Sequence, residues 1–385
     1  MAAHAKLSAS AAHRWLNCPG SVAMGELFPA TTSIFAEEGT LAHECGEYLI
    51  SQGEIPGLLK SRIEDYYKAT PGLDGTYQEM VDYVTEYADF VKAELSEALK
   101  EDPAAQVMTE QKVDLSKWIP GGFGTTDAAI IRDGVLHIVD LKYGKGVPVS
   151  AHDNPQLRLY ALGTLDLLDI VFDIDLVKMT IYQPRLGNVS TDQIKAKDLI
   201  AWGDEVIKPG AKEALKKDTY EAAGPWCQFC PAKATCRERA NHNMEVEAFR
   251  KKKLLSPDEI GEIIGKADDL AKWSADLKEE ALNKALAGER IPGWKVVAGR
   301  ANRKYKGTEE EIVRQAEGAG YDRALLYESK LLTVTAMEKL MGKKKFADVM
   351  GLYIEKPEGK PTIVPESDKR PALTNGNAAE DFADE

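Results

Sequence analysis

The pair Asp133-Gly134 constrains the fold of this chain more than any other short feature, because it separates two β-rich segments by only two residues. These segments are 126–132 and 135–143. An Asp-Gly pair between such segments is typical of a tight β-hairpin turn. The turn fixes the strand register, so Arg132 is expected to face Val135.

This register brings charged side chains to one face of the hairpin. Counting outward from the turn, Asp127 faces Asp140, with the two Cβ atoms about 4.5–5.5 Å apart. Lys142 follows Asp140 by two positions and therefore shares its face. Facing like charges destabilise a hairpin unless something cationic lies between them.

Two interpretations of this charged group remain open. Two carboxylates beside a lysine suit a divalent cation with oxygen ligands, which can polarise a phosphodiester and activate bound water. Lys142 would then orient that water or stabilise developing charge. In the alternative, the hairpin lies at the surface and Lys142 only neutralises Asp127 and Asp140.

The segments around the hairpin predict an α/β fold. Helical patterns are expected at 11–16, 40–51, 81–99 and 154–168, the last with Asn154 as N-cap and Pro155 as first residue, and strands at 107–113 and 176–183. This order predicts a small mixed sheet flanked by helices. Capping boxes at Ser256/Glu259 and Thr308/Glu311 predict a mainly helical C-terminal part. The predicted domains are 1–240 and 241–370, followed by an acidic, disordered tail at 371–385.

Three further side chains extend the candidate site. His43 stands early in the helix predicted at 40–51 and could complete a coordination shell, although a lone helical histidine is more often a buried or surface residue. Gln156 and Tyr160 are four residues apart and share one face of the next helix. Plain packing of Tyr160 is the alternative interpretation.

Taken in order, these motifs resemble the RecB-like branch of the PD-(D/E)XK nucleases. They are a helical His43, Gly124-Thr125-Thr126-Asp127, Asp140-Leu141-Lys142 and Gln156-x-x-x-Tyr160. The resemblance implies a restriction-endonuclease-like core that hydrolyses DNA phosphodiesters. It further implies Mg²⁺ or Mn²⁺ bound by His43, Asp127, Asp140 and the backbone carbonyl of Leu141. Its catalytic residues would be Asp127, Asp140, Lys142, Gln156 and Tyr160.

The cysteines form a second constellation, in which Cys227-x-x-Cys230-x5-Cys236 is compact and Cys18 is a distant fourth. Four thiolates suit zinc or an iron–sulfur cluster, and the spacing does not decide between them. Linking Cys18 to Cys227 would close a loop of about 210 residues. The arrangement resembles AddB-type helicase-nucleases and CRISPR-adaptation exonucleases, which implies a 4Fe–4S cluster that staples the two ends of the nuclease domain. Cys45 is expected to be buried packing.

Charge restricts where nucleic acid could bind. With 49 Lys+Arg against 62 Asp+Glu, the net charge of −13 argues against a phosphate-binding surface that covers the whole protein. The segment 284–306 is locally basic, with Trp294 and Tyr305 interleaved. It is predicted to bind DNA through Arg300, Arg303 and Lys304, or else to be a solvated face.

The expected location is cytoplasmic, because no apolar run approaches the roughly 20 residues of a membrane helix and the N-terminus lacks an apolar signal core. A membrane partner is not expected. Five cysteines in such a compartment are not expected to pair as structural disulfides.

These features predict a metal-dependent DNA nuclease, with an exonuclease acting on single strands or duplex ends as the favoured form. The whole chain, including 332–346 and 360–373, resembles a phage- and prophage-borne group of RecB-like proteins. That resemblance implies a role in phage DNA recombination or replication beside the phage proteins of those processes. The alternative is a non-catalytic DNA-binding or recombination accessory protein held together by an Fe–S or zinc site.

Overall fold

The computed structural model describes residues 5–28, 33–70, 73, 75–168, 171–245, 255–297, 308–319, 322–326, 334, 342–350 and 353. The chain divides into two compact units, Met1–Val297 and Ala298–Glu385. This division differs from the predicted boundary near residue 240. The reason is that helix α10 (Pro257–Leu286) packs against α9 (Arg237–Met244) and so belongs to the first unit.

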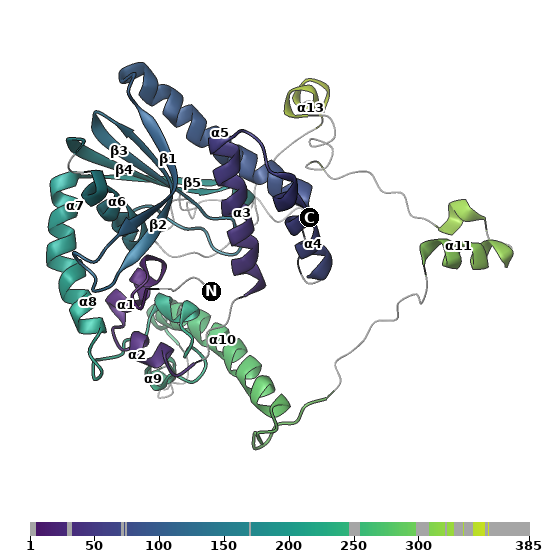
Figure 1. Ribbon diagram of the computed structural model, residues 1–385. Coiled ribbons are helices and arrows are strands. Elements are labelled where there is room, and N and C mark those ends of the chain that lie inside the picture. The colour runs from purple at the N-terminus through teal and green to yellow at the C-terminus, as the bar shows by residue number, and fades with distance from the viewer. Residues whose placement is uncertain are drawn as a thin grey trace. The chain divides into compact units, whose positions relative to one another are not determined.

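A mixed sheet of five strands, in the order β1-β2-β3-β4-β5, forms the centre of the first unit (Figure 1). The strands are β1 (Gln106–Asp114), β2 (Phe123–Arg132), β3 (Gly134–Leu141), β4 (Ile174–Gln183) and β5 (Asn188–Lys195). Strands β3 and β4 are parallel and joined through helix α6 (Pro155–Leu168), whereas the other neighbours are antiparallel. The prediction of a small mixed sheet flanked by helices is confirmed.

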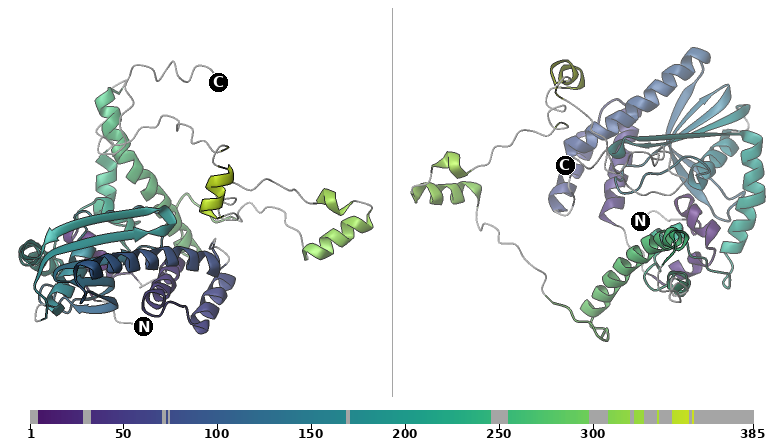
Figure 2. Two further views of the ribbon diagram at one scale, coloured as in Figure 1. Left: turned by 90° about the horizontal axis from the view of Figure 1, so that it is seen from above. Right: turned by 180° about the vertical axis from the view of Figure 1, so that it is seen from behind.

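Helices cover both faces of this sheet (Figures 1 and 2). One apolar core lies under α3 (Ile34–Ser51), α4 (Gly57–Ala69) and α5 (Tyr77–Glu101). The other lies under α1 (Ala12–Asn17), α6, α7 (Ala196–Trp202) and α8 (Lys208–Ala214). Strand β2 supplies Ala128 and Ile130 to the first core and Ala129 and Ile131 to the second, because successive side chains of a strand point to opposite faces.

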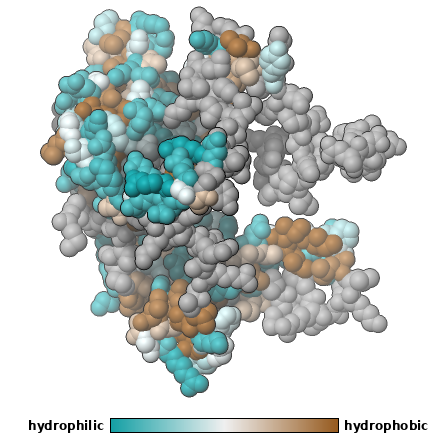
Figure 3. All heavy atoms as spheres, turned by 90° about the vertical axis from the view of Figure 1, so that its right-hand side faces the viewer, coloured by the Kyte–Doolittle hydropathy of each residue, from teal (hydrophilic) through white to brown (hydrophobic). Residues whose placement is uncertain are grey.

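Short elements complete the first unit. They are η1 (Ala9–Ala11), α2 (Ser21–Gly25), η2 (Pro184–Leu186), the π-helical turn η3 (Gly203–Ile207) and η4 (Pro225–Phe229). None of the described helices is both long and apolar enough to cross a membrane. The coloured residues in Figure 3 form polar surface interrupted by separate apolar patches.

The hairpin register agrees with the prediction. Arg132 pairs with Val135, and the ladder continues in step to Ala128 and Val139. Gly134 has a φ of 71°, a left-handed conformation that glycine adopts without strain.

The second unit is helical in its described parts. These are α11 (Glu309–Gly318), η6 (Arg323–Leu326) and α13 (Lys343–Met350). The predicted capping box of Thr308 and Glu311 opens α11, and the capping box of Ser256 and Glu259 opens α10 in the first unit. The tail predicted at 371–385 lies outside the described residues.

Candidate active site and cysteine cluster

A close approach of two helices places His43 at the end of the sheet. Gly46 on α3 faces Tyr87 on α5 so closely that an added Cβ would lie 3.1 Å from the Tyr87 ring. A larger side chain at this position would push α3 away. His43, about one turn earlier on α3, comes within 3.2 Å of Asp127, measured from Nδ1 to Oδ1.

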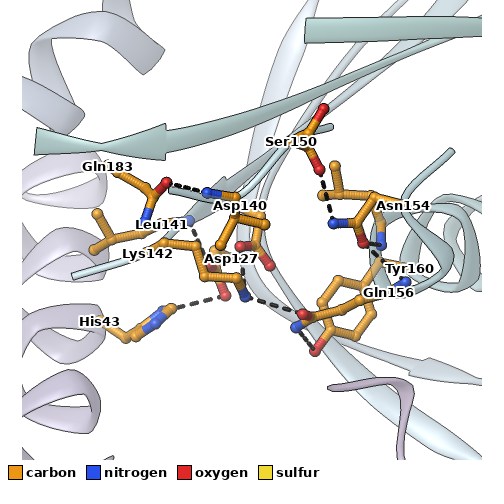
Figure 4. A network of polar contacts seen from close by, with 12 residues as sticks. His43, Asp127, Asp140, Leu141, Lys142, Ser150, Asn154, Gln156, Tyr160 and Gln183 are labelled. Carbon is orange, nitrogen blue, oxygen red and sulfur yellow. Dashed lines mark hydrogen bonds and ion pairs between the residues drawn. The ribbon is translucent and has the colours of Figure 1, made fainter. Parts of the chain in front are cut away.

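Asp127 lies one position beyond the last pair of the β2–β3 ladder. Its second oxygen, Oδ2, accepts a hydrogen bond of 2.8 Å from the backbone N–H of Leu141. The ladder thus ends just before the predicted pair of Asp127 and Asp140, and the side chain of Asp127 accepts a hydrogen bond there in place of a backbone carbonyl. This anchor fixes the carboxylate of Asp127 beside Asp140 and Leu141 (Figure 4).

The other predicted residues form a continuous chain of polar contacts (Figure 4). Lys142 Nζ lies 2.8 Å from Asp140 Oδ2 and donates to Gln156 Oε1 at 3.0 Å. Gln156 Nε2 donates in turn to the hydroxyl of Tyr160 at 3.0 Å. The structure thus brings together every side chain that the sequence assigned to this site.

The N-terminus of α6 is held in place by local contacts. Asn154 Oδ1 accepts hydrogen bonds from the backbone N–H groups of Gln156 and Leu157, as the predicted N-cap requires. The ring of Tyr160 lies over Gly124, where an added Cβ would approach it to 2.9 Å. Gly124 therefore leaves the space that Tyr160 occupies.

The loop between β3 and α6 is hydrogen-bonded to side chains of β4 and β5, the last two strands of the sheet. Buried Gln183, at the end of β4, accepts from the N–H of Val149 at 2.6 Å. Two side chains of β5 accept from the same loop: Ser190 from the N–H of Ala151 and Asp192 from the N–H of Asp153. These bonds set the path of the chain from Lys142 to Gln156.

The two aspartates carry opposite pKa shifts. Burial raises the pKa of Asp140, and the charge of Asp127 raises it further against the opposing effect of Lys142. Burial would also raise the pKa of Asp127, but His43, Lys142 and the N–H of Leu141 hold it below its usual range. Such a separation is typical of two carboxylates that share one site.

Glu110 belongs to this site and was missed from the sequence. Its carboxylate approaches His43 Nδ1 to 3.9 Å, and ligand atoms of His43, Glu110 and Asp127 all lie within 4.8 Å of one another. Burial and the charge of Asp127 raise the pKa of Glu110 to about 7. Nothing in the residue types of β1 marks Glu110 as a ligand. Only the pairing of β1 with β2 shows that it lies beside Asp127.

Binding of a divalent cation here is expected to release a proton. Burial lowers the pKa of His43, but the charge and hydrogen bond of Asp127 outweigh it and raise the pKa to about 9. Below that pH a cation must displace the imidazole proton, so the logarithm of the Mn²⁺ affinity should rise by about one for each unit of increasing pH up to about pH 9 and level off above it. Electron paramagnetic resonance titrations of Mn²⁺ between about pH 7 and about pH 9 measure this slope. The same titration with His43→Gln should be flatter, and a wild-type affinity independent of pH would exclude His43 as a ligand.

The four predicted cluster cysteines line one small cavity, formed where α1 meets the segment that contains η4. Burial raises the pKa of the Cys18 thiol, and the nearby thiols of Cys230 and Cys236 raise it further. Backbone N–H groups of Ala222 and Gly224 point at the sulfurs of Cys18 and Cys227, at 3.3 and 3.4 Å. Such bonds are usual around metal-bound thiolates.

No three of these four sulfurs lie within 4.8 Å of one another. Two sulfurs on one tetrahedral zinc ion are only about 3.8 Å apart, given the Zn–S bond length. The fifth cysteine, Cys45, is fully buried away from this cavity, as predicted, and burial raises its pKa to about 12.

Arg239 connects the cysteine cavity to α10. Its guanidinium is fully buried, lines the cavity and forms ion pairs with Asp269 at 2.8 Å and Asp276 at 2.7 Å. Trp273, between these two aspartates on α10, donates its indole N–H to the carbonyl of Ala234. One face of α10 is therefore fixed to the cysteine-bearing segment.

Replacing Arg239 with Met is expected to lower the free energy of unfolding by about 3–5 kcal/mol, because two partly buried carboxylates lose their counter-charge. Hydrogen exchange should then increase along α10. Urea unfolding and exchange mass spectrometry measure the two effects. Arg237→Met, two residues earlier on the exposed side of α9, is the matched control. Equal stability of the two variants would show that the buried ion pairs contribute little.

The predicted DNA contacts Arg300, Arg303 and Lys304 lie outside the described residues. Within the described part of the basic segment, Trp294 is strongly exposed. A second ligand group, formed by His152, Asp153 and Asp192, already has Arg158 as a cationic partner.

Comparison with known proteins assigns the sequence to a family. The model of the family described as "Protein of unknown function (DUF2800)" matches residues 4–371. The chain belongs to this family. A solved structure titled "Crystal structure of SSO0001" is similar to the DUF2800 chain at 16% identity, covering 53% of this chain and 97% of that chain. Its TM-score of 0.24 is too low to indicate a shared fold. The function of this DUF2800 chain is therefore inferred from its own residues.

Proposed function

We propose that this protein is a metal-dependent deoxyribonuclease that hydrolyses DNA phosphodiester bonds. The observation that carries the proposal is the unbroken set of contacts from Asp140 through Lys142 and Gln156 to Tyr160, with the pair of His43 and Asp127 beside it. A hairpin that merely balanced its charges would need Lys142, but it would have no need of a histidine brought from α3.

The donor set fits Mg²⁺ or Mn²⁺. Carboxylate oxygens of Asp127 and Asp140 are the ligands that hard divalent cations prefer, and one imidazole is compatible with Mn²⁺. Asp140 is 1% exposed, and its Oδ2 has no hydrogen bond of good geometry despite the nearby ammonium of Lys142. The backbone carbonyl of Leu141 is the further ligand that the motif order implies.

When bound, the ion would polarise a phosphodiester oxygen and lower the pKa of its water. Lys142, held between Asp140 and Gln156, would orient the attacking water or stabilise the charge that develops on the phosphate. Gln156 and Tyr160 would keep the ammonium of Lys142 in place. The burial of Asp140 excludes bulk water and strengthens these interactions.

The cysteine cavity would hold a 4Fe–4S cluster, with zinc as the alternative. The resemblance of the cysteine arrangement favours the cluster, and the N–H groups that point at Cys18 and Cys227 suit thiolates bound to either metal. Either centre would join the segment after α1 to the segment that contains η4.

The substrate would be single-stranded DNA or duplex ends, and exonuclease action is the favoured form. The setting we infer is phage DNA recombination or replication in a bacterial cytoplasm, with other phage proteins of those processes as partners.

Labelled single-stranded and duplex DNA, incubated with purified protein and Mn²⁺, tests the activity. We expect cleavage that a chelator stops and that added Mn²⁺ or Mg²⁺ restores. Product lengths then show whether nucleotides leave from an end. Absence of metal-dependent cleavage of either substrate, in protein that retains its cluster, would favour the DNA-binding accessory role instead.

A further inference from the structure

We propose that helix α10 pairs with α10 of a second copy of this chain, antiparallel, about a two-fold axis level with Trp273. This inference goes beyond the proposed nuclease and does not rest on it. It concerns the face of α10 that points away from the first unit. In Figures 1 and 2 the C-terminal half of α10 extends beyond the rest of that unit.

One face of α10 is held by its own chain. Trp273 is 6% exposed and donates its indole N–H to the carbonyl of Ala234. Asp269 and Asp276, about one turn before and after Trp273, form ion pairs with buried Arg239. Because these contacts fix the rotation of the helix about its axis, the opposite face is directed to solvent.

The outward face is apolar over most of the length of the helix. A helix has about 3.6 residues per turn, so side chains nine residues from Trp273 point to the side opposite to it. These are Ile264 and Leu282, which are 40% and 47% exposed. The same face continues to Ile260 and Leu286, about 39 Å apart, which are 45% and 69% exposed. An exposed apolar surface of this length indicates an interaction site.

The order of side chains on this face is the same from either end. Ile264 and Leu282 stand nine residues before and after Trp273, and two exposed alanines, Ala271 and Ala275, stand two residues before and after it. Copies related by a two-fold axis use the same patch, so that patch must be complementary to itself. In an antiparallel pair centred on Trp273, Ile264 of one copy meets Leu282 of the other, and Ala271 meets Ala275. This match favours a second copy over an unrelated partner, which would not require the symmetry.

Small and charged residues extend the match. Alanines in the middle of the face allow two helix axes to approach to about 8 Å, at the short end of the usual range. Asp268 and Lys278 border the face five residues before and after Trp273, and both are exposed. In the antiparallel pair Asp268 of one copy lies level with Lys278 of the other. The charges at the border of this face thus complement those of a second copy.

The expected dimer is weak. A single pair of helices about 39 Å long gives an interface at the low end of the size range of specific complexes. We expect a dissociation constant of about 1–100 µM, so that monomer and dimer coexist at accessible protein concentrations.

Sedimentation velocity of the full chain between about 1 and about 200 µM tests the pairing. The wild type should shift from monomer to dimer across this range. Ile264→Glu and Leu282→Lys should each weaken the dimer by about tenfold or more, because each buries a charge against an apolar side chain of the other copy. The double variant should recover most of the wild-type affinity, since its new carboxylate faces its new ammonium in the antiparallel arrangement.

Leu58→Glu is the matched control. Leu58 on α4 is 78% exposed, so the same kind of substitution is made at an exposed leucine outside α10. This variant should dimerise as the wild type does, and circular dichroism melting should show that each variant is folded. Hydrogen exchange of the wild type alone gives a second test: residues 260–286 should exchange more slowly at about 100 µM than at about 2 µM.

Either of two results would overturn the proposal. One is a wild type that stays monomeric up to about 200 µM, with hydrogen exchange of α10 independent of concentration. The other is a dimer that the single variants leave intact or that the double variant fails to recover, which would place the contact elsewhere or in a different register.

Discussion

Asp140→Asn is expected to lower the rate of Mn²⁺-dependent DNA cleavage on the order of a thousandfold. Asparagine keeps the shape of the side chain but removes the charge that Lys142 contacts at 2.8 Å. The bound ion loses an anionic ligand, and Lys142 loses the partner that holds it toward Gln156. Single-turnover cleavage of end-labelled DNA at saturating Mn²⁺ measures the chemical step without product release.

The matched control is Asp192→Asn. Asp192 is also a partly buried carboxylate, on strand β5, but it accepts from the N–H of Asp153 in the loop and has no contact with Lys142. We expect its cleavage rate to stay within about tenfold of wild type. If Asp140→Asn cleaved DNA as fast as this control, the assignment of the active site would be wrong.

Loss of the cysteine-bound centre is expected to cause the largest loss of stability. Cys18 near the N-terminus and Cys227 after the sheet line one cavity, and a bond through a shared centre restricts a loop of about 210 residues in the unfolded chain. By analogy with a covalent cross-link, this restriction contributes about 5 kcal/mol. Cys227→Ser should therefore lower the free energy of unfolding by several kcal/mol, on the order of that value.

Iron analysis and visible spectroscopy accompany the unfolding measurement. Anaerobically purified wild type should be brown, with broad absorption near about 400 nm, and Cys227→Ser should lose most of it. Cys45→Ala is the control, since Cys45 is buried outside the cavity and should retain the colour. A colourless wild type that contains zinc would show that zinc, and not an iron–sulfur cluster, binds the four cysteines. The expected loss of stability would then stay the same.

Most of the candidate site was predictable because it depends on local rules. An Asp-Gly turn fixes strand register, and register alone places Asp127, Asp140 and Lys142 on one face. A helix cap at Asn154 then sets the phase of α6 and so directs Gln156 toward Lys142. Each step needs only a few neighbouring residues.

What the sequence did not reveal depends on contacts between distant segments. Glu110 joins the site through the pairing of β1 with β2, and its left-handed backbone has no signature in the residue types around it. Helix α10 belongs to the first unit because buried Arg239 forms ion pairs with Asp269 and Asp276, which follow it by 30 and 37 residues. The spacing of apolar residues along the sequence does not reveal such a pairing.

Strand β5 was missed for a different reason. Its sequence, Asn188 to Lys195, is mostly polar, and its side chains alternate between half-buried and exposed, as befits an edge strand. Apolar alternation was too weak to indicate a strand there.

The polar side chains of β5 hold the loop between β3 and α6. Ser190 and Asp192 accept hydrogen bonds from two positions of the loop after β3. The outermost strand therefore helps to set the distance between the ammonium of Lys142 and the amide of Gln156. Changes at this edge are therefore expected to have only a modest effect on the proposed DNA cleavage, within about tenfold, because they shift the loop and remove no side chain of the candidate site.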